Sequence, residues 1–311
     1  MMETNKPSIV FMGTPEFALP ALKAVHSEFG ISAVVTVPDK PKGRGLKLIP
    51  SPVKEKALEF GLPVLQPESL SDTLFIEELK SYKPDIILVI AFRILPKEVY
   101  SLANLASFNI HASLLPKYRG AAPINWAIIN GEKETGLTSF ILEDKVDTGN
   151  ILLQRKIQIP RNATAGDLHD LFMQVSAILA IETCNLLING NYDLQQQDSS
   201  LASSAPKLFR EKCKINWNEN AENVKNYIHG TSPVPGAWSI LDGKTLKIFR
   251  VDFAGNSFGQ PGEYLIENSE LKVNCLQGAL TIKELQCEGK KPMPIYDFIL
   301  GFRAETRGHF E

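Results

Sequence analysis

The sequence is poor in cysteine and has no closely spaced cysteine pair. Its 311 residues include four cysteines, Cys184, Cys213, Cys275 and Cys287, and no C-x-x-C occurs among them. Pairs with that spacing are typical of structural zinc sites and of redox-active disulfides. We therefore expect free thiols in a reducing compartment, with no disulfide and no metal site.

Long apolar runs and an excess of charge of one sign are also missing. The longest apolar run, Ile86 to Phe92, is far too short to span a bilayer. The acidic Glu3 and the short apolar run Ile9–Met12 do not match a signal peptide. The formal net charge of −2 argues against attraction of the whole surface to nucleic acid, so any polyanion would be held by a local patch. We expect a cytoplasmic protein without membrane attachment.

Motifs of several well-known site chemistries are absent. The dinucleotide fingerprint G-x-G-x-x-G would follow the first predicted strand, Ser8–Met12, but only Gly13 is available there. The phosphate-binding pattern G-x-x-x-x-G-K-[ST] is not satisfied, and H-E-x-x-H does not occur. The chain therefore offers no motif for a P-loop nucleoside triphosphatase or a zinc peptidase.

The composition and length that are present fit two soluble domains. Hydrophobic residues make up 44% and charged residues 22%, which is ordinary for a globular protein, and 311 residues are many for one core. Gly190–Ala205 contains three consecutive glutamines and clustered serines, which predicts a linker. We expect a first domain at residues 1–189, a linker at 190–206 and a C-terminal domain at 207–311.

The first domain alternates predicted strands with helices. The predicted strand Asp85–Phe92 is apolar at nearly every position, which is typical of a parallel sheet covered by helices on both faces. The predicted strands are Ser8–Met12, Ser32–Val37, Asp85–Phe92 and Ser107–His111. Thr164 and Asp167 have the spacing of a capping box before a long helix. This order predicts an α/β fold with a doubly wound, mostly parallel, Rossmann-like sheet.

The C-terminal part has a different pattern, with short alternating strands separated by turn residues. The predicted strands are Thr245–Val251, Glu263–Ile266, Leu271–Asn274 and Leu280–Leu285. Such a series predicts a small β-barrel.

The stretch Ser107–Pro123, S-F-N-I-H-A-S-L-L-P-K-Y-R-G-A-A-P, holds the main candidates for chemistry. Asn109 and His111 are two apart in a predicted strand, so their side chains point to the same side. A shaped loop follows, and open α/β sheets bind ligands at this carboxyl edge. By itself, a histidine beside a strand is more often a structural residue than a catalytic one.

The segment N-x-H-x-S-L-L-P resembles the active-site signature of folate-dependent formyltransferases, and K-Y-R-G-A-A-P-I resembles their methionyl-tRNA branch. K-L-x-x-E-x-x-x-I-x-W from Lys207 to Trp217 extends the resemblance into the C-terminal part. The resemblance implies formyl transfer from 10-formyltetrahydrofolate to methionyl initiator tRNA, for translation initiation, by a monomer. It also implies that the C-terminal barrel is an OB-fold-like tRNA-binding domain.

The resemblance assigns catalysis to Asn109, His111 and Asp147, the last within V-D-T-G. An Asp in a turn is commonly a backbone-capping residue, so Asp147 would not stand out alone. The three residue types fit the chemistry, because an amide can donate to an oxyanion, an imidazole can carry a proton and a carboxylate can orient it.

The resemblance places the folate at one loop, with a second segment behind it. The implied contact residues are Ser113, Leu114, Leu115, Pro116, Val89, Ile90 and Phe92. The chain departs from the family here, because Ala91-Phe92-Arg93 stands where A-Y-G is usual. From the sequence, Arg93 could face solvent or the glutamate tail of the folate.

A basic segment, P-D-K-P-K-G-R-G-L-K-L-I-P, lies between Val37 and Ser51. Its composition fits either a solvated, mobile surface loop or a loop that binds phosphates by releasing counterions. The resemblance favours the second interpretation and implies that this loop, 38–51, grips the acceptor end of tRNA. The implied tRNA contacts are Lys42, Arg44, Lys47, Lys207 and Arg210.

Three functions remain open from the residues. The first is formylation of methionyl-tRNA. The second is formylation of a small amine, such as a nucleotide-sugar or glycinamide ribonucleotide, or hydrolysis of formyltetrahydrofolate. The third is a binding module without catalysis. The basic loop, R-G-A-A-P-I and the β-rich C-terminal part favour the first.

Overall fold

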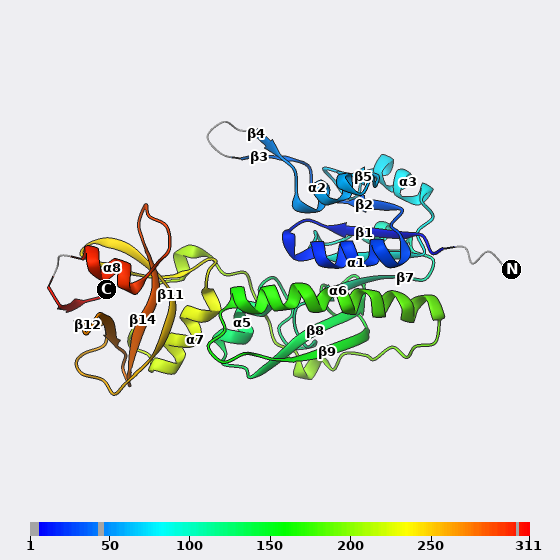
Figure 1. The fold of residues 1–311 in the computed structure, drawn as a ribbon. Coiled ribbons are helices and arrows are strands. Elements are labelled where there is room, and N and C mark those ends of the chain that lie inside the picture. Colours follow the sequence, from blue (N-terminus) through cyan, green and yellow to red (C-terminus); the bar gives the residue numbers. More distant parts are fainter. Residues whose placement is uncertain (1–5, 43–46, 303–304) are drawn as a thin grey trace. The chain divides into compact units, whose positions relative to one another are not determined.

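The computed structural model describes residues 6–42, 47–302 and 305–311, and they form two compact units (Figure 1). The N-terminal unit comprises Met1–Gly120, Gly136–Ile157 and His169–Ser204, and the C-terminal unit comprises Ala121–Thr135, Gln158–Leu168 and Ala205–Glu311. Two stretches from the middle of the chain thus belong to the C-terminal unit. The predicted domain limits, 1–189, 190–206 and 207–311, remain a prediction.

The N-terminal unit is built on a seven-stranded sheet with the order β5-β2-β1-β6-β7-β8-β9 (Figure 1). The strands are β1 (Ile9–Gly13), β2 (Ala33–Val35), β5 (Val64–Leu65), β6 (Ile86–Ile90), β7 (Ala106–His111), β8 (Glu134–Ile141) and β9 (Ile151–Gln158). Pairings from β5 to β7 are parallel, and β8 pairs antiparallel to β7. The prediction of a doubly wound, mostly parallel α/β sheet is confirmed.

Local sequence explains the elements of this sheet. Every residue of β1 and β6 is buried, as the apolar runs predict. The helices that accompany the strands are α1 (Leu19–Phe29), α2 (Pro52–Glu59), α3 (Thr73–Ser81) and α4 (Lys97–Tyr100). Ser51 caps α2 by accepting the Lys54 N–H, and Pro52 occupies the first turn of the helix.

Helix α6 (Ala165–Asn189) is the longest helix in the described chain. Its capping box is formed, since Thr164 Oγ1 accepts the Asp167 N–H and Asp167 Oδ2 accepts the Thr164 N–H. Among the described residues, it is also the one helix long and apolar enough to cross a membrane. Its Phe172, Leu179 and Cys184 side chains are fully buried, so α6 packs in the core of the fold.

The C-terminal unit holds an antiparallel half-barrel with the order β10-β11-β14-β13-β12-β16, and β15 pairs with β14. The strands are β10 (Ala237–Leu241), β11 (Lys244–Gly255), β12 (Glu263–Glu267), β13 (Glu270–Asn274), β14 (Ala279–Cys287), β15 (Met293–Pro294) and β16 (Arg307–His309). Register shifts between β11 and β14 mark irregularities that bend the pair. Helices α5 (Pro123–Ile129), α7 (Ala221–Thr231) and α8 (Ile295–Gly301) complete the unit. The predicted small barrel is therefore present as an open half-barrel.

The basic loop contains regular structure. Strands β3 (Lys40–Lys42) and β4 (Lys47–Ile49) pair antiparallel, with Pro41 opposite Leu48. Figure 1 shows this hairpin projecting from the rest of the N-terminal unit. The sequence predicts a loop here from its glycines and prolines, and the structure adds a short hairpin to it. Arg44 lies outside the described residues.

Candidate active site

The carboxyl end of β7 carries two of the three predicted catalytic side chains. Asn109 pairs in register with Val89 of β6, and His111 pairs with Thr138 of β8. Being two residues apart, Asn109 and His111 project from the same face of the sheet. Because β6 and β7 are parallel, this end of the two strands is the edge at which ligands of α/β sheets bind.

A hydrogen bond to a backbone carbonyl shows which nitrogen of the His111 ring carries the hydrogen. His111 is 6% exposed, and its Nε2 lies 2.8 Å from the carbonyl oxygen of Tyr118. A carbonyl oxygen can only accept, so Nε2 carries the hydrogen. The other ring nitrogen, Nδ1, lies 3.8 Å from Asp147 Oδ2. In the neutral imidazole, Nδ1 is therefore the ring nitrogen without a hydrogen, and it faces the carboxylate.

Asp147 reaches this place from the loop between β8 and β9. It is 8% exposed, and its Oδ2 accepts the backbone N–H of Gly120 at 2.9 Å. Its φ of 57° lies in the left-handed region, which costs energy for a residue with a side chain and is characteristic of functional sites. At Gly149 a Cβ would collide with the Ile141 carbonyl oxygen, so the close return of the loop to β8 requires glycine.

Asn109 presents an unused polar atom in this site. Its Oδ1 is buried and has no hydrogen-bond partner among the described residues. Buried polar atoms are normally satisfied, and an exception calls for an explanation such as a catalytic role or an ordered water. Rotation of the carboxamide exchanges its oxygen and its NH₂, so Asn109 can offer an acceptor or a donor there.

The segment predicted to bind folate is braced by two polar side chains. Thr138 Oγ1 accepts the Leu115 N–H and donates to the Ser113 carbonyl oxygen, and Gln154 Nε2 donates to the Leu115 carbonyl oxygen. These backbone groups of Ser113 and Leu115 are thus already hydrogen-bonded to side chains of the protein. Contacts of Ser113, Leu114, Leu115 and Pro116 with a folate remain a prediction. Thr138 and Gln154 carry no motif, so no sequence signal pointed to their role.

The end of β6 and the residues after it are the place where the chain departs from the family pattern. Val89 and Ile90 are buried, Phe92 is half-buried, and Ala91 has a φ of 50°. Arg93 donates from Nη1 and Nη2 to the carbonyl oxygens of Glu68 and Pro67, at 2.9 and 2.8 Å. It therefore binds a neighbouring loop rather than facing solvent, and burial lowers its pKa. The folate contacts of Val89, Ile90 and Phe92 remain predictions.

The predicted tRNA contacts fall in two places. Lys42 and Lys47 are the paired end residues of β3 and β4. The acidic Asp39 at the base of this hairpin forms an ion pair with Lys54 of α2, at 2.6 Å, so it is already neutralised. In the C-terminal unit, the Lys207 ammonium lies 5.5 Å from the centroid of the half-exposed Phe209 ring, and Arg210 follows it. Basic side chains beside an aromatic ring are a combination found in proteins that bind single-stranded nucleic acid.

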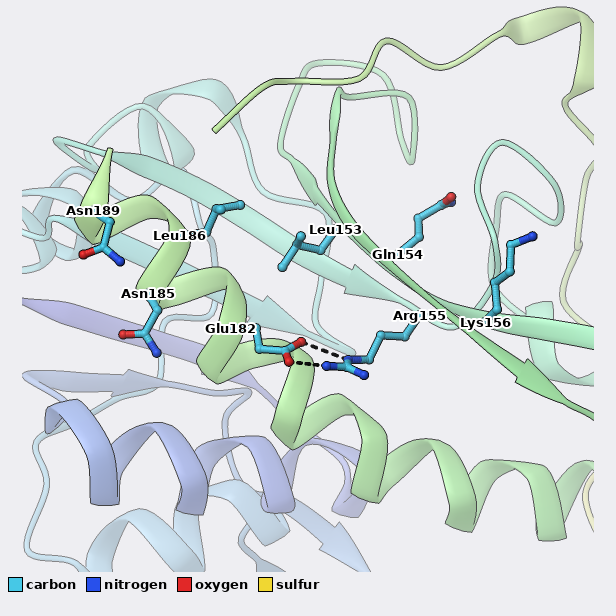
Figure 2. A pocket seen from close by; sticks show the side chains of 8 residues that line it. All are labelled: Leu153, Gln154, Arg155, Lys156, Glu182, Asn185, Leu186 and Asn189. Carbon is cyan, nitrogen blue, oxygen red and sulfur yellow. Dashed lines mark hydrogen bonds and ion pairs between the residues drawn. The ribbon is translucent and has the colours of Figure 1, made fainter. Parts of the chain in front are cut away.

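A separate pocket of about 720 Å³ lies between β9 and α6 (Figure 2). Figure 2 shows Leu153 and Arg155 pointing toward α6, while Gln154 and Lys156 point the opposite way. Arg155 and Glu182 form a bidentate ion pair in which each charge neutralises the other. The hydrogen bonds to Glu182 raise the Arg155 pKa. The pocket contains none of the predicted catalytic residues.

Cysteine and metal chemistry find no support in the described part of the chain. All four cysteines are free, and burial raises the pKa of the Cys184 and Cys275 thiols to about 12. Among residues 6–42, 47–302 and 305–311, no group of three His, Cys, Asp or Glu side chains could hold a metal ion.

Comparisons with known families match both parts of the chain. The family model described as Formyl transferase matches residues 7–183, and Formyl transferase, C-terminal domain, matches residues 207–303. A methionyl-tRNA formyltransferase of Geobacter sulfurreducens is 46% identical over 300 residues, which cover 96% of this chain and 94% of the relative. One from Chlorobium phaeovibrioides is 45% identical over 313 residues, covering 98% of each.

Solved structures share the fold at lower identity. A sugar 3N-formyl transferase, solved in the presence of dTDP and 5-N-formyl-THF, has a TM-score of 0.68 at 20% identity, covering 92% of this chain and 100% of that chain. HypX from Aquifex aeolicus, in complex with tetrahydrofolic acid, has a TM-score of 0.64 at 20% identity, covering 96% of this chain and 47% of that one.

Proposed function

Because this chain belongs to the formyl transferase family, we propose that Asn109, His111 and Asp147 surround the carbonyl group that it transfers. The overall activity is that of a methionyl-tRNA formyltransferase, since relatives with this activity are 45–46% identical over nearly the full chain. The observation that carries the site assignment is the 3.8 Å approach of Asp147 Oδ2 to His111 Nδ1.

The formyl donor is 10-formyltetrahydrofolate, as a co-substrate. This donor is supported by the family and by fold relatives solved with tetrahydrofolic acid or folinic acid. Its formyl oxygen would take the position beside Asn109, whose buried Oδ1 has no partner in the described structure. With the carboxamide turned, its N–H group would stabilise the oxygen as negative charge develops, and one such donor contributes about 3–4 kcal/mol.

The reaction moves one proton as well as the formyl group. The neutral amine of the methionyl residue attacks the formyl carbon, and a new C–N bond forms. The proton released by this amine is passed, through Nδ1 of His111 and the Asp147 carboxylate, to the folate nitrogen that leaves as its bond to the formyl carbon breaks. His111 is suited to the transfer because Tyr118 holds its other nitrogen protonated.

The acceptor is methionyl initiator tRNA. Lys42, Arg44 and Lys47 of the hairpin, together with Lys207 and Arg210, would bind its phosphates. The net charge of −2 supports this view of local patches, because the whole surface does not attract RNA. We place the reaction in the cytoplasm and assign it to a monomer.

A formylation assay with matched acceptors tests this function. Initiator and elongator methionyl-tRNA are each incubated with 10-formyltetrahydrofolate and the full chain, and a dTDP-amino sugar serves as the small-amine control. We expect formylation of initiator tRNA with a higher kcat/KM than of elongator tRNA, and no product from the sugar. Equal use of both tRNAs would contradict the selectivity, and use of the sugar alone would contradict the assigned acceptor.

A further inference from the structure

We propose that Gln197 is the positioning residue of the active site and holds the Asp147 loop against His111. This inference rests on the proposed function. Gln197 lies in the stretch 190–206, which the sequence predicts to be a linker. It is 7% exposed, whereas its neighbours Gln195 and Gln196 are exposed. One glutamine of the run is thus buried against the N-terminal unit, to which it belongs.

The Gln197 carboxamide uses both of its ends. Nε2 donates to the carbonyl oxygens of Asp147 and Gly149, at 3.0 and 2.8 Å. Oε1 accepts from Nε and Nη2 of Arg119, at 3.1 and 2.6 Å. Carbonyls only accept and a guanidinium only donates, so the amide fits in one orientation. The side chain therefore ties the Asp147 loop to the segment that follows His111.

The Asp147 loop requires hydrogen bonds that hold its backbone conformation. Asp147 has left-handed backbone, which persists only where the surroundings hold it. On the exposed side of the loop, Tyr100 donates to Asp144 Oδ1. On the buried side, the hydrogen bonds from Gln197 to the backbone of residues 147 and 149 fix the path of the loop on both sides of Thr148.

The same chain segment also supports His111. Ser203 Oγ accepts the Tyr118 N–H, and the Ser203 carbonyl oxygen accepts the Arg119 N–H. The Tyr118 carbonyl in turn accepts from His111 Nε2. Residues 195–203 therefore brace both partners of the 3.8 Å approach, Asp147 through Gln197 and His111 through Tyr118.

The sharpest variant is Gln197→Glu, which keeps the size and the acceptors for Arg119. It removes both N–H donors and places a carboxylate oxygen against two carbonyl oxygens. We expect kcat for formylation of initiator tRNA to fall by about 10- to 100-fold, because a displacement of about 1 Å costs up to that factor. The KM values for both substrates should stay within about twofold. Gln197→Ala is the second variant, and the exposed Gln196→Glu, which introduces the same charge one residue away, is the control.

Coupling to Asp147 separates positioning from a general structural effect. In an Asp147→Asn background, Gln197→Glu should lower kcat further by less than about twofold. The same fold reduction in both backgrounds would overturn the proposal, and so would unchanged kcat in Gln197→Glu and Gln197→Ala.

A spectroscopic readout needs no turnover. In protein labelled with ¹⁵N-histidine, the ring signals of His111 are identified by their loss in His111→Gln. Gln197→Glu should shift them and Gln196→Glu should not; unshifted signals in Gln197→Glu would also overturn the proposal. If Asp147→Asn itself turned over at the wild-type rate, the proposed function of Asp147 would fail instead, which is a distinguishable result.

Discussion

At the scale of single residues, one backbone carbonyl decides what His111 can do. Hydrogen bonding to Tyr118 keeps Nε2 protonated and leaves Nδ1 toward Asp147. The distance of 3.8 Å between Nδ1 and Asp147 Oδ2 is longer than a hydrogen bond, so the proposed proton transfer requires a closer arrangement in the reacting complex. Asn109, two residues away on the same strand, has a buried Oδ1 with no hydrogen-bond partner among the described residues. In the proposed mechanism, Asn109 stabilises the developing charge and His111 transfers the proton, so the two roles fall to two residues of one strand.

We predict that Asn109→Ala lowers kcat by about 10²- to 10³-fold, because it removes the donor to the developing oxyanion. His111→Ala should lower kcat by at least about 10²-fold. The Kd for the folate, measured by calorimetry, should stay within about twofold in both variants, since the proposed roles of both side chains concern the formyl group and not the pteridine. His169→Ala on α6 is the matched control. Turnover near the wild-type rate in Asn109→Ala or His111→Ala would sink the site assignment.

At the scale of elements, helix α7 is fastened to β11 through a buried imidazole. The Val251 N–H donates to His229 Nε2 at 3.1 Å, so this nitrogen is an acceptor and unprotonated. Burial, reinforced by the neighbouring Lys225 charge, lowers the pKa of His229 to about 4. The connection between helix and half-barrel thus depends on a neutral histidine, which makes the C-terminal unit sensitive to acid.

The sign of this effect follows from the two pKa values. An unfolded histidine has a pKa near about 6.5, so below that pH the unfolded chain takes up a proton that the folded chain refuses. The free energy of unfolding therefore falls as pH drops from about 6.5 to about 4, by roughly 3 kcal/mol from this residue.

We predict that His229→Gln flattens this part of the pH dependence. Urea unfolding followed by tryptophan fluorescence measures it, since all three tryptophans, Trp126, Trp217 and Trp238, lie in the C-terminal unit. The control is His169→Gln, which should leave the slope unchanged. A wild-type slope in His229→Gln would show that another group carries the acid sensitivity.

The hairpin β3–β4 supplies the second prediction at this scale. Replacing Lys42, Arg44 and Lys47 by glutamine should raise the KM for tRNA and make its dependence on salt concentration shallower, by roughly one unit of logarithmic slope for each phosphate that the variant no longer binds. The folate Kd should not change. Lys23→Gln on α1 is the control for removal of a surface charge. A weaker folate Kd in the triple variant would refute the assigned role of the hairpin.

At the scale of the whole molecule, charge is balanced and binding must be local. The chain has 33 Lys and Arg against 35 Asp and Glu. The proposed tRNA contacts are accordingly local basic residues in each unit, because a balanced net charge gives no general attraction to RNA. The two units are also not continuous in sequence, because residues 121–135 and 158–168 belong to the C-terminal unit although they lie between segments of the N-terminal unit.

We predict that the protein is a monomer in solution. Asn109, His111 and Asp147 come together within one chain, so the proposed mechanism uses no residue of a second copy. Light scattering after size exclusion should give a mass of 34.4 kDa at micromolar concentration, with and without folate. A mass of twice that value, together with activity that depends on dilution, would contradict the prediction.

The sequence by itself determined what depends on neighbours along the chain. Apolar runs specified the buried strands β1 and β6, Ser51 and Thr164 marked helix starts, and N-x-H placed two side chains on one face. These features follow from periodicity and capping, which act over a few residues.

Only the tertiary structure decided the contacts between distant segments. Gln197 binds residues about fifty positions away, in a stretch whose composition predicts a linker, and Arg93 binds carbonyls of an earlier loop. Thr138 and Gln154 brace Leu115 across the sheet in the same manner. Their partners are backbone atoms, and every residue type has a backbone carbonyl, so such a bond leaves no pattern in the sequence. Only the fold brings its two ends together.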